Sequence, residues 1–208
     1  TSTASVSATG ITMLRLTGTN YVITPYVLTN PELNRVFDVK SPYNDLSDIH
    51  IYNLPTAMQQ YYIAYKVASV SGMRETALNL NDPSWNQKYD AIINDSDRQL
   101  NADNRSDANI EVKAYSDTKK IFNYQSDTDG YFMLLTYFYP GWEAKVDGVK
   151  APIINGNISS MAVFASKGSH CIEFTFVPKS LYLGAIVSGI SVVLYCAFII
   201  LQVRRKQA

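Results

Sequence analysis

Few residues of this 208-residue sequence combine in a pattern that could carry out catalysis. His170 could act as a general base, because imidazole titrates near neutral pH, but no partner for it is visible in the sequence. In the turn that starts at Lys167 it more simply begins a strand or hydrogen-bonds the turn. Asp147 opens an Asp147-Gly148 pair, which is typical of a hairpin turn, so we interpret it as structural. We therefore predict no catalytic residue in this chain.

Metal binding is also not expected. Four aspartates lie in one polar stretch: Asp95, Asp97, Asp103 and Asp107. Carboxylates at this density could hold Ca²⁺, but their spacing is not that of the EF-hand loop, and a solvated loop is the preferred interpretation. Zinc is not expected, because the chain has only the histidines His50 and His170 and shows no His/Cys spacing typical of a zinc site. We expect no metal and no cofactor.

Three residues could contact a sugar. Trp142 follows a Pro-Gly pair at the start of a strand, where an indole ring could stack on the apolar face of a pyranose. Its alternation with Ala144 predicts instead that it faces a protein core. Asn155 and Asn157 lie in a loop from which their amides could hydrogen-bond a glycan, although the chemistry of a turn alone also explains them.

The segment Leu181–Val203 predicts a transmembrane helix. It contains no charged residue, and at 1.5 Å per residue it crosses a hydrocarbon core of roughly 30 Å. The basic residues that follow, from Arg204 on, indicate that a short tail, 204–208, stays in the cytoplasm. The domain before the helix should then lie on the extracytoplasmic face of the cell membrane.

The rest of the chain predicts an α+β region followed by an all-β sandwich. Residues 1–93 mix short helical and strand patterns, and residues 94–109 form a polar linker or loop. From residue 110 to 178 short strands alternate with turns at regular intervals, which is typical of a β-sandwich. The fold class is therefore an α+β region, a β-sandwich and one C-terminal transmembrane helix.

Composition excludes one class of partner and leaves others open. Zero net charge and a pI near 6.6 argue against nucleic-acid binding. The 15 tyrosines fit β-structure and also sugar-binding surfaces. No leader precedes the domain, so we expect either a removed signal or, preferably, upstream transmembrane helices of the same protein. Gly184 and Ser188, four residues apart in the span, suit packing against such a helix.

Several motifs resemble the C-terminal end of the bacterial YfhO-type membrane proteins. They comprise a YPGW segment, a VDG turn, a G-x-H turn and a final strand that runs into the last span. The residues that carry these motifs are Tyr139, Pro140, Gly141, Trp142, Asp147, Gly148, Gly168 and His170. Segments 14–25, 49–55 and 90–95 are also similar to that family, whereas the segment after Asn157 is longer than its counterpart there.

The resemblance implies a polytopic glycosyltransferase of the GT-C type. Such enzymes transfer sugar from a lipid-phosphate carrier to a polymer outside the cell, here of the teichoic-acid kind. Their catalytic acid lies in the first extracytoplasmic loop, so this chain would support or position the acceptor without being catalytic itself. The expected partners are the lipid bilayer, the upstream helices and a cell-surface polysaccharide.

Two other functions stay open. The first is a non-catalytic glycan-binding or scaffolding module anchored in the membrane, which suits an aromatic, β-rich chain without a reactive set of residues. The second is a single-span surface anchor or adhesin, which would require a cleavable signal peptide directly before Thr1.

Overall fold

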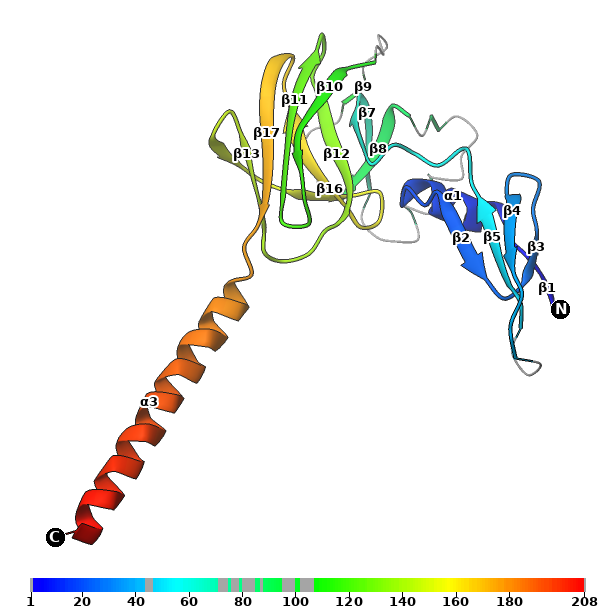
Figure 1. Ribbon diagram of the computed structural model, residues 1–208. Coiled ribbons are helices and arrows are strands. Elements are labelled where there is room, and N and C mark those ends of the chain that lie inside the picture. Colours follow the sequence, from blue (N-terminus) through cyan, green and yellow to red (C-terminus); the bar gives the residue numbers. More distant parts are fainter. Residues whose placement is uncertain are drawn as a thin grey trace.

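The protein consists of a β-sandwich, a small N-terminal unit beside it and one long C-terminal helix, as the computed structural model in Figure 1 shows. The structure describes residues 2–43, 47–70, 75, 79, 85–86, 88–94, 100–101 and 107–207. The predicted fold class is confirmed, because strands dominate the domain and one apolar helix ends it.

The first sheet of the sandwich is antiparallel and has five strands in the order β10-β11-β17-β13-β14. Their bounds are β10 Asn109–Tyr115, β11 Lys119–Ser126, β17 Gly168–Phe176, β13 Trp142–Val146 and β14 Val149–Ala151. Between β13 and β14, Asp147 has φ of 50° and Gly148 has φ of 80°. Positive φ at both positions is the signature of the type I′ hairpin turn that the Asp-Gly pair predicts.

The second sheet has seven strands in the order β6-β12-β16-β15-β8-β7-β9. Their bounds are β6 Tyr61–Ala64, β12 Gly130–Tyr137, β16 Ser160–Ala165, β15 Ile154–Gly156, β8 Asp90–Asn94, β7 Lys66–Val70 and β9 Leu100–Asn101. β6 pairs with β12, and β8 pairs with β15. Strands from the predicted α+β region are therefore part of the sandwich, and a boundary at residue 93 does not separate two sheets.

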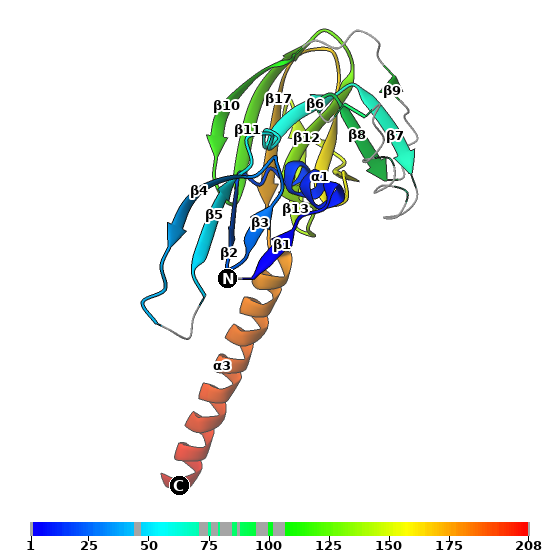
Figure 2. The ribbon, with the colours of Figure 1, turned by 90° about the vertical axis from the view of Figure 1, so that its right-hand side faces the viewer.

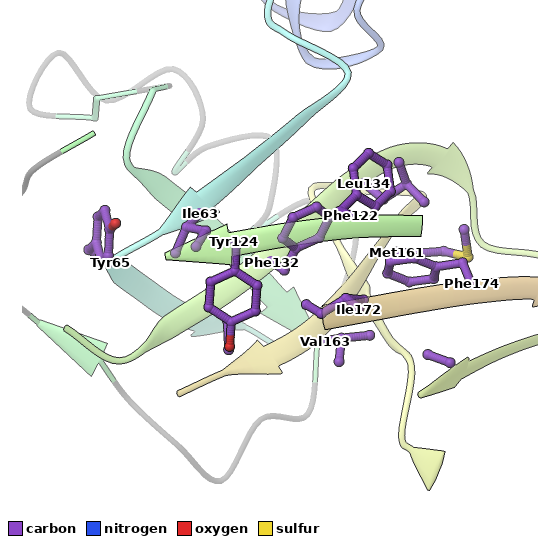
Figure 3. Packing of buried hydrophobic residues seen from close by; sticks show 12 residues of the cluster. Ile63, Tyr65, Phe122, Tyr124, Phe132, Leu134, Met161, Val163, Ile172 and Phe174 are labelled. Atoms are coloured by element: carbon purple, nitrogen blue, oxygen red, sulfur yellow. The ribbon is translucent and has the colours of Figure 1, made fainter. Parts of the chain in front are cut away.

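The main core lies between these two sheets. Alternate residues of each strand point inward, because successive side chains of a strand face opposite sides. Figure 3 shows the aromatic rings of Phe122, Phe132 and Phe174 packed together between the sheets. The ring centres of Phe122 and Phe132 are 5.0 Å apart, and each of these side chains is fully buried. This aromatic core fixes how one sheet lies on the other.

The N-terminal unit combines one short helix with two small sheets. The elements are β1 Thr3–Ser5, α1 Ala8–Leu16, β2 Tyr21–Thr24, β3 Val27–Thr29, β4 Asn34–Val39 and β5 Ile49–Asn53. Strand β1 pairs with β3, and the other sheet has the order β2-β5-β4. The Ser7 side chain accepts a hydrogen bond from Gly10 N at 3.1 Å and caps α1. Ile11, Leu33, Tyr52 and Leu54 form the core of this unit.

Helix α3, Lys179–Gln207, leaves the sandwich directly after β17 and extends away from the rest of the protein in both views (Figures 1 and 2). Within Lys179–Gln202 the most apolar window of 18 residues has a mean hydropathy of 2.4, and none of that window is buried against the protein. At 1.5 Å per residue this length is sufficient to cross a bilayer. A helix whose apolar stretch is not buried against the protein is suited to lipid surroundings.

Candidate functional site

A cleft of about 960 Å³ opens where the N-terminal unit meets the open edge of the sandwich. The wall is built from the end of α1, the connection between β5 and β6, strand β6, the residues before β8 and the start of β10. β6 and β10 are the edge strands of their sheets, so the cleft lies at the side where the sandwich is not closed. Segments far apart in the sequence therefore share one concave surface.

Four aromatic side chains line this cleft: Tyr62, Tyr65, Trp85 and Tyr89. The rings of Tyr65 and Tyr89 lie 6.4 Å apart at an angle of 37°. The hydroxyl of Tyr65 is 3.1 Å from Ser126 Oγ, which holds the ring in place. Tyr62 is almost fully buried, and this burial raises the pKa of its hydroxyl far above the usual value. The aromatic wall is thus fixed by contacts on the side away from solvent.

The cleft also carries two ion pairs. Lys88 and Asp107 approach to 2.6 Å, and Tyr89 donates a hydrogen bond to the same carboxylate at 2.8 Å. These two hydrogen bonds, first that of Lys88 and then that of Tyr89, lower the pKa of Asp107. On the other wall the guanidinium of Arg15 pairs with Glu32 and donates to Thr56 Oγ1 at 2.9 Å.

The described lining is suited to binding rather than to bond breaking. It supplies one carboxylate, Asp107, together with the amides of Gln59 and Asn86, and it contains no histidine or cysteine. Within the described ranges no three His, Cys, Asp or Glu side chains are grouped to hold a metal ion. Of the four aspartates considered for calcium, Asp107 is committed to Lys88, and the other three lie outside the described residues.

The VDG and G-x-H motifs meet in space. Nδ1 of His170 lies 2.6 Å from Oδ2 of Asp147, while Oδ1 of Asp147 accepts a hydrogen bond from the backbone N of Cys171 at 2.8 Å. The backbone N of Asp147 in turn donates to the carbonyl of Cys171 at 2.9 Å. Sequence inspection did not reveal this partner of His170, because the two residues belong to different turns.

The electrostatics of this contact follow from its geometry. The backbone donor of Cys171 and then His170 lower the pKa of Asp147, while Asp147 raises the pKa of His170. Nε2 of His170 is 3.1 Å from Ser166 Oγ and also 3.1 Å from the carbonyl of Lys167, so both ring nitrogens have partners. His170 is thus held near the start of β17 by partners at both ring nitrogens, which supports a structural interpretation of the pair.

The YPGW segment makes a tight connection to the last strand. Gly141 has φ of 115°, and a Cβ there would lie 2.8 Å from Cε2 of Phe176. Trp142 lies on the inner face of β13, with its ring centre 5.4 Å from that of Phe176. The ammonium of Lys120, which is only 5% exposed, sits 5.0 Å from the indole centre. Trp142 thus packs against Phe176 and Lys120, and its contact with a sugar stays a prediction.

Asn157 corrects one of the sugar-contact predictions. Its side chain is 3% exposed, its Oδ1 accepts from the backbone N of Ile92 at 2.9 Å, and its Nδ2 donates to the hydroxyl of Tyr62 at 2.6 Å. A buried amide with both ends bonded cannot reach a glycan. Asn155 is half-buried and donates to the carbonyl of Ile158 at 3.2 Å, so it closes the same turn.

The residues of the cleft were missed by sequence analysis. The signal that could have found them is a short run rich in aromatic and amide side chains just before β8, which contains Trp85, Asn86 and Tyr89. Such a run carries no helix or strand period. Its partners in the cleft, such as Asp107 and Tyr65, belong to other segments of the chain. These residues form a candidate site only because the fold brings their separate segments together.

Two comparisons with known proteins place the sandwich in a family context. Residues 93–188 match the family model described as bacterial membrane protein YfhO. The chain is 30% identical over 93 residues to the uncharacterized protein YfhO of Bacillus subtilis strain 168, over 45% of this chain and 10% of that protein. It therefore spans about a tenth of the length of that relative. No solved structure matches the chain.

The matched segment contains every motif residue named for the resemblance, from Tyr139 to His170, and it continues into α3. The earlier segments 14–25 and 49–55 lie outside it, so their similarity stays a prediction. From β8 into α3, over residues 93–188, the chain is therefore similar to the bacterial membrane protein YfhO.

Proposed function

We propose that this chain is the extracytoplasmic, acceptor-holding part of a YfhO-type membrane glycosyltransferase. The catalytic centre would lie elsewhere in the whole protein, which would transfer sugar from a lipid-phosphate carrier to a teichoic-acid-like polymer. The chain itself would bind a stretch of that polymer and hold it near the membrane. On this proposal the chain alone has no transferase activity.

The cleft beside β6 is the observation that carries this proposal. Aromatic faces bind the apolar side of a sugar ring, and amides and charged groups bind its hydroxyls. Tyr65, Tyr89 and Trp85 supply the aromatic faces. Asn86 and Gln59 supply the amides. The side chain of Lys88 is 60% exposed and pairs with Asp107. Its ammonium could release Asp107 and pair instead with a phosphate group of the polymer. A volume of about 960 Å³ is at the upper end of ordinary ligand sites, as a polymer segment requires.

The basic residues at the C-terminal end of α3 support the proposed orientation in the membrane. Arg204 and Arg205 come directly after the apolar stretch, and Lys/Arg residues are enriched on the cytoplasmic side of membrane proteins. With that end inside, the sandwich and the cleft face the outside of the cell, where the polymer is. The upstream helices would pack beside α3, for which its small residues Gly184 and Ser188 are suited.

The main alternative is a glycan-binding or scaffolding module without any transferase. The same cleft supports both functions, because binding is common to them. They differ in what the loss of the whole protein does to the cell surface. In a transferase the polymer loses a sugar substituent, whereas in a scaffold its composition is unchanged.

The test of binding uses the chain in detergent micelles and purified teichoic acid, followed by isothermal titration. Tyr89→Ala removes one aromatic face and should weaken binding about fivefold, as expected for a loss of about 1 kcal/mol. Tyr26→Ala is the matched control, because Tyr26 is exposed and lies outside the cleft. Equal affinity in all three proteins, or no binding at all, would reject the cleft as the acceptor site.

The test of the reaction uses cells that lack the whole protein. Sugar analysis of the wall polymer is compared after complementation with the unmodified protein, with Tyr89→Ala and with Tyr26→Ala. Acceptor positioning is supported if the unmodified protein and Tyr26→Ala restore the sugar content of the polymer and Tyr89→Ala restores less of it. An unchanged polymer in the deletion strain favours the scaffold.

A further inference from the structure

Three exposed aromatic side chains follow one another from the last residue of β12 into the connection after it. Tyr137 is 66% exposed, Phe138 is 39% exposed and Tyr139 is 58% exposed. Single exposed aromatic residues are common on protein surfaces, but several exposed aromatic residues together mark a surface that a membrane or another molecule covers. We call residues Tyr137–Tyr139 the aromatic loop.

Hydrogen bonds hold the aromatic loop in place. The backbone N of Phe138 donates to the carbonyl of Ser159 at 2.6 Å, and the carbonyl of Gly141 accepts from Val177 N at 2.7 Å. The ring of Tyr139 lies 6.4 Å from that of Phe176. The loop is thereby attached to the last residues of β17 and has one defined position on the domain.

That position is at the point where α3 begins. Val177 is only two residues before Lys179, the first residue of the helix. Lys179 also pairs with Glu143 of β13 at 2.9 Å, which gives a second contact between the start of the helix and the end of the sandwich. The apolar stretch begins just after Lys179, at Leu181, so the bilayer surface should lie at this level of the molecule.

We propose that the aromatic loop inserts into the headgroup region of the same leaflet that α3 enters. Tyrosine is enriched at membrane interfaces, because its ring is apolar and its hydroxyl stays hydrated. Tyr182, 60% exposed in the first turn of α3, would lie at the same depth. The proposal requires that α3 spans the membrane, but it does not depend on what the cleft binds.

Two contacts with the bilayer would limit the orientation of the domain. A domain attached through one helix can swing about the connection, whereas a second contact beside the first fixes its tilt. The cleft would then be held at a constant height above the lipid. The occupant proposed here is lipid, and a neighbouring protein segment over the same residues is the competing outcome of the test.

The experiment uses the full chain in phosphatidylglycerol vesicles that contain a lipid with a quencher near the top of its acyl chain. Phe138→Trp and, in a second protein, Tyr137→Trp place a reporter in the aromatic loop. Val149→Trp is the control, because Val149 is 71% exposed and follows β13 at the end away from Gly141. The unmodified chain supplies the baseline from Trp85 and Trp142.

If the loop inserts, both loop reporters gain fluorescence that is blue-shifted and strongly quenched by the labelled lipid, while the control reporter is not quenched. If the loop reporters are quenched no more than the control, the proposal is wrong. A blue shift without quenching would also overturn it, because it would mean that protein rather than lipid covers the loop. The use of two positions protects the test against a local defect at either one.

Discussion

Asp147 and His170 connect two turns that are 23 residues apart in the sequence, with a distance of 2.6 Å between Oδ2 and Nδ1. Asp147 is also part of a type I′ turn, and His170 is the third residue of β17. The pair therefore ties the β13–β14 hairpin to the start of the last strand. Two family motifs that look like separate signals in the sequence are one structural unit.

This contact predicts a pH dependence of stability. Because the pKa of His170 is raised on folding, its contribution is present below the unfolded value near 6.5 and is lost as pH rises through the folded value. The pKa of Asp147 is lowered, so its contribution is lost as pH falls through a value below 3.8. The pair thus stabilises most between about pH 4 and 6.5.

The measurement is the thermal midpoint of the chain in detergent at pH 5.5 and pH 8.5. The unmodified chain should lose a small amount of stability at the higher pH, below about 1 kcal/mol because the pair is partly exposed. His170→Gln should abolish this difference. An equal difference in both proteins would mean that the pH effect comes from another group.

A second prediction concerns the glycine of the YPGW segment. Gly141→Ala should strongly lower the unfolding temperature, because the residue has positive φ and its new Cβ would meet Phe176. Gly148→Ala is the matched control: φ is also positive, but nothing lies within 4 Å. The control should cost about 1–2 kcal/mol for the backbone conformation alone. Equal losses measured by thermal unfolding would contradict the steric argument.

A third prediction distinguishes a structural Asn157 from a ligand-binding one. Asn157→Ala leaves the backbone N of Ile92 without its acceptor, and it removes the donor to the hydroxyl of Tyr62, which keeps only its own bond to the carbonyl of Asp90 at 3.4 Å. We expect a loss of about 2–3 kcal/mol, typical of buried polar groups that lose a hydrogen bond. Urea unfolding checks this value. Asn155→Ala, at a half-buried site with one donated bond, should cost less. A glycan-binding Asn157 would instead change affinity and leave stability intact.

A fourth prediction concerns the domain boundary. A fragment that starts at residue 94 should not fold, because it lacks β6, the neighbour of β12, and also β7 and most of β8. It would expose the inward side chains of Phe132 and Leu134, which pack with Ile63 of β6. A fragment that starts at residue 55 retains these strands and should fold. Amide dispersion in NMR spectra of the two fragments decides between them, and a folded shorter fragment would contradict the prediction.

Local patterns in the sequence determined much of the architecture. The turn at Asp147-Gly148 was predictable because positive φ at both residues favours this pair, and the alternation from Trp142 to Val146 reflects one strand with one inner face. The apolar stretch of α3 was predictable from length and composition. The motifs that resemble YfhO could be recognised in the sequence because each is a short run of neighbouring residues.

Only the tertiary structure decided which strands share a sheet. β6 joins the sandwich by pairing with β12, and β8 joins it by pairing with β15. β7 pairs in parallel with β8 and antiparallel with β9. The tertiary structure likewise buried Asn157, joined His170 to Asp147 and assembled the cleft around Tyr89. The physical reason is that periodicity reports how one segment meets solvent, whereas pairing and clefts depend on contacts between distant segments.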